Sequence, residues 1–169
     1  MKTTNMKPKI ITIVGKSNSG KTTFLEKLIA LLTQRGYKIG SVKHAHDGFE
    51  MDKEGKDSWR HRKAGARTTL VIAQNEVAII KDDKTSSIEK MKSYLSDMDL
   101  ILAEGFKKQI LPKIEIFMSQ SVHKEPFCME DENLIAFVTD SDYRPDVPLF
   151  GLEDIRQIAN FIESNFLKS

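Results

Sequence analysis

Three short runs of apolar residues along the chain predict strands buried on both faces, because they lack the polar alternation of half-solvated strands. The runs lie at residues 10–14, 100–103 and 134–138. After the first run, apolar residues recur at helical spacing over 24–32 and stop before Gly36, and residues 37–42 alternate again. Strand, helix and strand in this order predict a right-handed βαβ unit. We therefore expect an α/β fold of three layers, with a mainly parallel sheet flanked by helices.

The other patterns predict further helices and one more strand. A short helix is expected from about Asp57, and the capping box of Ser86 and Glu89 predicts the start of another. The alternating residues 113–117 predict a strand with one buried face. The closing helix carries apolar residues on one face: Ile155, Ile158, Ala159, Ile162 and Phe166.

Two β-type runs, 68–73 and 76–80, flank Gln74-Asn75 and predict a protruding hairpin. A hairpin alone is marginally stable, and an apolar one with free edges either covers its own sheet or pairs with another chain. We expect pairing across a two-fold axis, and hence a homodimer. Cover within one chain is the alternative.

A phosphate-binding motif lies between the first strand and the first helix. The sequence GKSNSGKT at 15–22 matches G-x-x-x-x-G-K-[ST], whose backbone N–H groups surround phosphates at the positive end of a helix dipole. Lys21 would neutralise phosphate charge, and the Thr22 hydroxyl would hold Mg²⁺. The predicted nucleotide-binding residues of this segment are Gly15, Lys16, Ser17, Asn18, Ser19, Gly20, Lys21, Thr22 and Thr23.

A metal site in such a fold needs an acidic residue at the carboxyl end of a neighbouring strand. Glu104 follows the run 100–103 and has this place, whereas Asp99 begins the run and lies at the wrong end. Asp52 or Asp57 could supply a second carboxylate from the loop after the second strand. We expect the metal region to contain Thr22, Glu104 and Asp57.

Composition narrows the class of protein. With 169 residues, 40% hydrophobic and 30% charged, the chain has the proportions of one globular domain, here residues 1–169. A net charge of +2 gives no general case for binding nucleic acid or membrane. The single Cys128 cannot form an internal disulfide, and no apolar run reaches 18 residues, so we expect a cytoplasmic protein.

The densest positive cluster is Arg60, Arg62, Lys63 and Arg67. Forked guanidinium groups suit phosphate oxygens, although a solvated basic face remains the alternative. Zinc is disfavoured at the neighbouring histidines, because carboxylates and thiols at ligand spacing are missing around them.

Taken together, these segments resemble the MobB proteins of molybdenum-cofactor biosynthesis. The similarity runs in order over residues 9–117 and includes the phosphate loop, the segment KDSWRHR at 56–62, the segment EGFK at 104–107 and PKIE at 112–115. One departure is His46-Asp47, where the family pattern has paired histidines.

The resemblance implies a GTP-binding adapter that assists the molybdopterin guanylyltransferase, a MobA-type enzyme that attaches GMP to molybdopterin. It implies a homodimer and weak GTPase activity. By motif, residues 15–23 would bind GTP and Glu104 would serve Mg²⁺. Molybdopterin or another anionic ligand would lie near Lys43, Arg60, His61 and Arg62.

Other functions stay open at this point. A small-molecule kinase needs the same phosphate loop, and a ligase resembling dethiobiotin synthetase shares the strand-ending Glu-Gly. The sequence does not decide between GTP and ATP. Guanine recognition commonly uses a carboxylate facing N1 and N2, and Asp140, just after the run 134–138, is a candidate for it.

Overall fold

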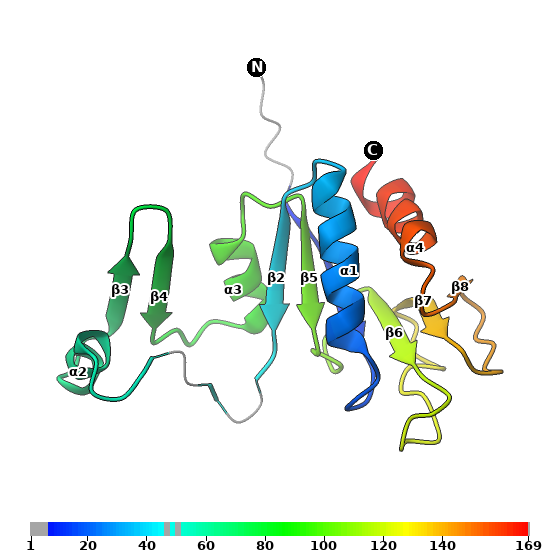
Figure 1. Ribbon diagram of the computed structural model, residues 1–169, viewed down its shortest axis with the longest axis horizontal. Coiled ribbons are helices and arrows are strands. Elements are labelled where there is room, and N and C mark those ends of the chain that lie inside the picture. Colours follow the sequence, from blue (N-terminus) through cyan, green and yellow to red (C-terminus); the bar gives the residue numbers. More distant parts are fainter. Residues whose placement is uncertain (1–6, 46–47, 50–51, 169) are drawn as a thin grey trace. The chain divides into compact units, whose positions relative to one another are not determined.

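The computed structural model describes residues 7–45, 48–49 and 52–168, and its chain divides into two compact units (Figure 1). The first, here called the sheet unit, comprises Met1–His44 and Lys90–Ser169. The second, here called the hairpin unit, is Ala45–Glu89. Each is described by itself.

The sheet unit is built on six strands in the order β2-β5-β1-β6-β7-β8, and every neighbouring pair is parallel. The strands are β1 (Lys9–Val14), β2 (Ile39–Lys43), β5 (Leu100–Glu104), β6 (Lys113–Phe117), β7 (Leu134–Thr139) and β8 (Leu149–Phe150). Because all strands run the same way, their carboxyl ends meet at one edge, the lower edge in Figure 1. The predicted parallel α/β fold is confirmed.

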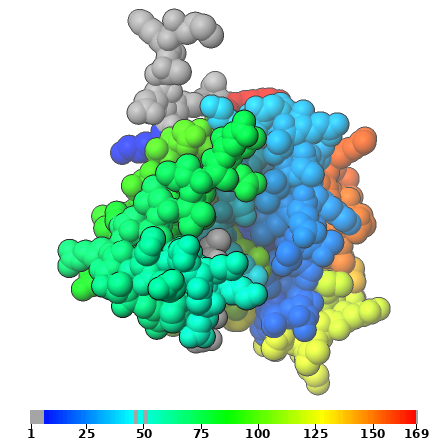
Figure 2. All heavy atoms as spheres, turned by 60° about the vertical axis from the view of Figure 1, so that its left-hand side comes forward, coloured from blue at the N-terminus to red at the C-terminus, as the bar shows by residue number. Residues whose placement is uncertain are grey.

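Helices α1 (Lys21–Gln34) and α4 (Ile155–Ile162) cover one face of this sheet and lie side by side (Figure 2). Their apolar stripes, with Leu28 and Ile158 fully buried, pack on alternate residues of the central strands. A single π-helical turn, Glu163–Leu167, continues α4. None of the described helices is long and apolar enough to cross a membrane.

The hairpin unit holds α2 (Asp57–Lys63), β3 (Thr68–Ile72) and β4 (Val77–Lys81). The predicted hairpin is present, with antiparallel partners Leu70↔Ile79 and Ile72↔Val77. Helix α3 (Ser87–Tyr94) begins in this unit. The predicted capping box forms, because Glu89 Oε2 accepts the backbone N–H of Ser86 at 2.9 Å and Ser86 Oγ accepts that of Glu89 at 3.3 Å.

The prediction for 113–117 was wrong in one respect. Strand β6 is buried on both faces, including Lys113 and Glu115. The Lys113 amino group pairs with Asp131 at 3.0 Å and donates to the Gln109 carbonyl at 2.8 Å. The Glu115 carboxylate accepts backbone N–H groups of residues 127 and 128. Charge alternation here marks partners inside the protein and not a solvated face.

Candidate functional site

The loop between β1 and α1 has the backbone that the phosphate motif requires. Gly15, Asn18 and Gly20 have φ values of 148°, 60° and 77°, which favour glycine and, less strongly, asparagine. A Cβ atom on Gly15 would lie 2.5 Å from the carbonyl oxygen of Ile116, so no side chain fits there. The loop therefore packs tightly against β6 and leads directly into the N-terminus of α1, where partial positive charge gathers.

The Lys21 side chain folds back over this loop. Its amino group donates to the Lys16 carbonyl oxygen at 2.7 Å and contacts Ser19 Oγ at 3.4 Å. Burial lowers the pKa of Lys21, Glu104 opposes this, and the positive charges of Lys107 and Lys43 lower the pKa further. These groups come from the end of β2, from the end of β5 and the loop after it, and from the first residue of α1, so the sheet edge gathers positive charge around one carboxylate.

The residues after β5 are fixed by close backbone packing. Glu104 ends β5 between Ile13 of β1 and Lys43 of β2 in register. A Cβ atom on Gly105 would lie 3.1 Å from the His44 Cβ, and the rings of His44 and Phe106 lie 4.6 Å apart. The Glu-Gly-Phe segment is thus held against the end of β2.

The donor set fits a magnesium nucleotide. Thr22 is exposed in the first turn of α1, and Glu104 is partly exposed at the same edge. Within the described ranges no group of three or more His, Cys, Asp or Glu side chains could hold a metal ion by itself. Mg²⁺ would therefore take oxygens from Thr22 and the phosphates, which is its usual mode with nucleotides.

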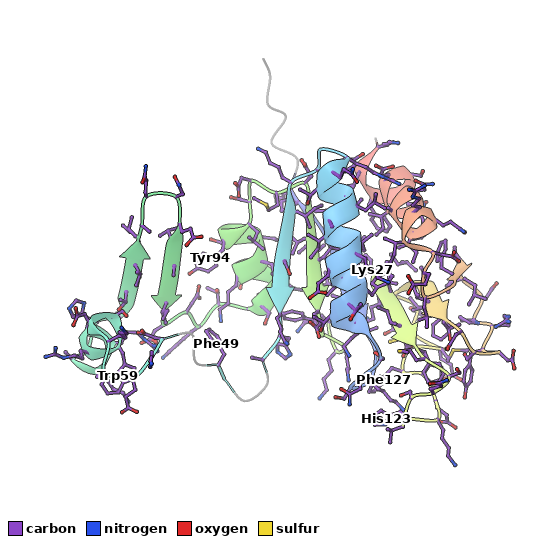
Figure 3. All side chains as sticks on the ribbon, viewed as in Figure 1. Lys27, Phe49, Trp59, Tyr94, His123 and Phe127 are labelled. Atoms are coloured by element: carbon purple, nitrogen blue, oxygen red, sulfur yellow. The ribbon has the colours of Figure 1, made fainter. Side chains whose placement is uncertain are left out.

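A cavity of about 190 Å³ lies beside the first two turns of α1. Its lining includes Gly20, Thr23, Met118 and Leu152, and mostly apolar groups face it. The ion pair of Lys27 with Glu153, at 2.6 Å, lies at its border (Figure 3). This cavity provides apolar walls next to the phosphate loop.

Asp140 follows β7 at the same edge of the sheet. Its carboxylate accepts the backbone N–H of Ser119 at 2.6 Å and the Ser119 hydroxyl at 3.0 Å. The bond from the Ser119 N–H lowers the pKa of Asp140, so the carboxylate stays charged. In this structure Asp140 joins the loops after β6 and β7, and its part in base recognition stays a prediction.

The other predicted site residues lie in the hairpin unit. Asp57, Arg60, His61 and Arg62 belong to α2, and all four are exposed. Asp57 and Arg60 approach each other to 3.7 Å. A cavity of about 490 Å³ in this unit is lined in part by Trp59, Arg62, Lys63 and Asp52. His46 and Asp47 lie outside the described residues.

The sequence analysis did not single out Phe127. It lies in the loop 118–133, which joins β6 to β7, and its ring is 3.8 Å from the Lys107 amino group and 5.2 Å from that of Lys16 (Figure 3). A single aromatic residue in a polar loop has no periodicity that marks it. No signal in the sequence could have found it, because Glu115, which binds its backbone N–H, is known to be buried only from the structure.

Comparison with known proteins places this geometry in a family. The family model described as "Molybdopterin guanine dinucleotide synthesis protein B", MobB, matches residues 10–140. The chain belongs to the MobB family. It is 35% identical over 158 residues to the molybdopterin-guanine dinucleotide biosynthesis adapter protein of Escherichia coli K12, covering 90% of both chains. The adapter protein of Haemophilus influenzae is 36% identical, with 92% of this chain and 88% of that one covered.

Solved MobB structures have the same fold. The crystal structure of Bacillus subtilis MobB superposes with a TM-score of 0.74 at 26% identity, over 95% of this chain and 99% of that one. A second MobB crystal structure gives a TM-score of 0.68 at 26% identity, over 92% and 98%. This chain therefore shares the P-loop NTPase fold with MobB proteins.

Proposed function

We propose that this protein binds GTP with Mg²⁺ and acts in the cytoplasm as an adapter in molybdopterin guanine dinucleotide synthesis. In this role it assists the MobA-type enzyme that attaches GMP to molybdopterin. The names of the relatives from Escherichia coli and Haemophilus influenzae support the adapter role. We treat residues 1–169 as one GTP-binding domain to which both compact units belong.

The main support for nucleotide binding is the phosphate loop at the β1–α1 junction. The left-handed residues of this loop turn its backbone sharply at the N-terminus of α1. Backbone N–H groups of 15–22 then bind phosphate oxygens, and the Lys21 amino group exchanges the Lys16 carbonyl for a phosphate oxygen. Thr22 and Glu104 of the sheet unit would lie at the bound metal ion.

The proposed site contains groups for binding a nucleotide and is expected to hydrolyse it slowly at most. The loop and Lys21 stabilise phosphate charge, whereas fast hydrolysis also needs a group that orients the attacking water or an arginine finger. We therefore expect at most weak GTPase activity. Slow hydrolysis suits an adapter that assists its partner enzyme while GTP is bound.

The anionic part of molybdopterin is proposed to bind in the hairpin unit at Arg60, His61 and Arg62. Support comes from the exposed basic residues of the last turn of α2 and from the cavity of the hairpin unit. There the Lys63 amino group lies 5.3 Å from the Trp59 ring, so cationic and aromatic groups occur together. Such a lining suits a ligand with a flat ring and a phosphate.

A homodimer is proposed through one face of the hairpin. Side chains alternate across a strand, so the cross-strand pairs Leu70–Ile79 and Ile72–Val77 share one face. Their exposed fractions are 51%, 49%, 75% and 59%. The opposite face carries buried Thr69 and also Val71, which is 51% exposed. A second copy would cover this apolar face.

The test is a thermal-shift panel of GTP, GDP, ATP and molybdopterin with Mg²⁺. Ligands that bind only the folded protein raise its melting temperature. We expect the largest shift with GTP, and we expect the protein to stimulate guanylyl transfer by the MobA-type enzyme. Transfer of labelled phosphate to a small acceptor, without such stimulation, would favour a small-molecule kinase.

A further inference from the structure

The loop 118–133 is anchored by a charged residue from inside the sheet. Glu115 of β6 is fully buried, and its two carboxylate oxygens accept the backbone N–H groups of Phe127 and Cys128, the latter at 2.7 Å. Burial raises the pKa of Glu115, and the two N–H groups oppose this rise. Cys128 packs with Val14 and Leu134 in a small buried cluster. The backbone of Phe127 therefore has a fixed position.

The side chain of Phe127 has a different environment from its backbone. Phe127 is 47% exposed, and the amino groups of Lys107 and Lys16 lie 3.8 Å and 5.2 Å from the centre of its ring. Both distances are within the range of about 6 Å for cation–π attraction. Lys16 is part of the phosphate loop, and Lys107 follows buried Phe106 at the end of β5. One ring thus attracts two positive charges, and this attraction offsets part of their mutual repulsion.

We propose that Phe127 is a positioning residue of the phosphate site. Its ring keeps the ammonium groups of Lys16 and Lys107 at the opening of the phosphate loop, and Glu115 fixes the backbone that carries the ring. Because the ring already orders the two lysine side chains, they lose less conformational entropy when they bind the nucleotide phosphates than freely moving lysines would. The inference rests on the proposed nucleotide binding and adds to it the residues that order these two cations.

The surroundings of the Phe127 ring distinguish this role from packing alone. Phe127 is 47% exposed with two cations within reach of its ring, whereas the neighbouring Cys128 is 5% exposed and packs in the core. A structural role would require the backbone anchor alone, which any side chain at 127 preserves. The competing role is stacking of the Phe127 ring on the nucleobase. In that role Phe127 would strengthen binding of GTP and would not affect binding of a phosphate chain that has no base.

The test compares Phe127→Leu with Phe127→Trp. Leucine keeps apolar bulk without an aromatic face, and tryptophan keeps the face. The control is Val122→Ala in the same loop, at a residue that is 91% exposed. Affinities for GTP and for inorganic tripolyphosphate, both with Mg²⁺, are measured by calorimetry at low salt. Circular dichroism and thermal melting check that each variant is folded.

We expect Phe127→Leu to weaken both GTP and tripolyphosphate by about tenfold, and Phe127→Trp and the control to stay within about twofold of the parent. Weaker GTP with unchanged tripolyphosphate would overturn the inference in favour of base stacking. Unchanged affinity for both would overturn it outright.

A second measurement needs no nucleotide. The ring current of Phe127 should shift the ε-methylene proton signals of Lys16 and Lys107 in the NMR spectrum of the ligand-free protein, and Phe127→Leu should abolish the shift. Parent protein without this shift contradicts the ring contact. Parent protein that has the shift but binds neither GTP nor tripolyphosphate contradicts the proposed function, and with it the positioning role.

Discussion

The two compact units differ in how much of their apolar side-chain surface is buried. In the sheet unit, successive residues of β1 and β5 are buried on both faces, and the charged groups inside β6 each have a partner. In the described part of the hairpin unit, Thr69 is the one buried residue, and five large apolar side chains of the hairpin are exposed: Leu70, Val71, Ile72, Val77 and Ile79. The sheet unit therefore has its own apolar core, whereas the hairpin leaves an apolar face exposed, which we propose a second copy covers.

The largest expected effect concerns the hairpin face. Ile72→Lys with Ile79→Lys places two cations on the apolar face, and burying them against a second copy costs more than the interface provides. We expect the parent to have twice the 19.2 kDa chain mass and the double variant to have 19.2 kDa, measured by light scattering.

Gln74→Lys, in the hairpin turn, is the control and should stay dimeric. The double variant should still bind GTP, because the phosphate loop lies in the sheet unit. A parent of 19.2 kDa, or a double variant that stays dimeric, would contradict the proposed interface.

The second prediction concerns the buried charge of β6. Asp131→Ala leaves the Lys113 amino group buried without its carboxylate, since Lys113 is 1% exposed and pairs with Asp131 at 3.0 Å. We expect the free energy of unfolding to fall by about 3 kcal/mol in urea titrations. Glu132→Ala, at the exposed neighbour, should change it by less than about 0.5 kcal/mol. Equal stabilities of the two variants would show that the pair does not hold β6.

The smallest effect is a pH dependence from Glu115. Burial raises its pKa in the folded protein, so the folded state binds the proton more tightly than the unfolded state does. Stability from this group is therefore present below its ordinary pKa of 4.5 and is lost as pH rises through the folded value.

Glu115→Gln removes this titration. The stability of the parent minus that of the variant should decrease with rising pH above 4.5, by less than about 1.4 kcal/mol per pH unit. Urea unfolding at a series of pH values measures the difference. A difference that increases with pH in this window would mean that hydrogen bonding to the carboxylate outweighs its burial.

Local patterns predicted most of the fold. The strand, phosphate loop and helix at 9–34 follow from a buried run, a motif and helical spacing, and the capping box of Ser86 needs only residues three apart. The environment of β6 could not be predicted in this way, because the partners of Lys113 and Glu115 come from the loop 118–133. The two-residue strand β8 is too short for a periodic pattern.

The candidate site also has a part that local sequence predicts and a part that it does not. The motif predicts glycine-specific backbone at Gly15 and Gly20, and both residues have positive φ values in the structure. The ring contacts of Phe127 depend on how three loops meet at the sheet edge, which no spacing along the chain encodes. Sequence therefore predicted the phosphate loop better than its surroundings.

The central claim is that the phosphate loop binds a nucleoside triphosphate through Lys21. Calorimetric titration of GTP with Mg²⁺ into the parent and into Lys21→Ala tests it most directly. We predict binding by the parent and at least roughly tenfold weaker binding by the variant, about 1.4 kcal/mol, with its fold intact by circular dichroism. Equal GTP affinity of the two proteins would contradict the account.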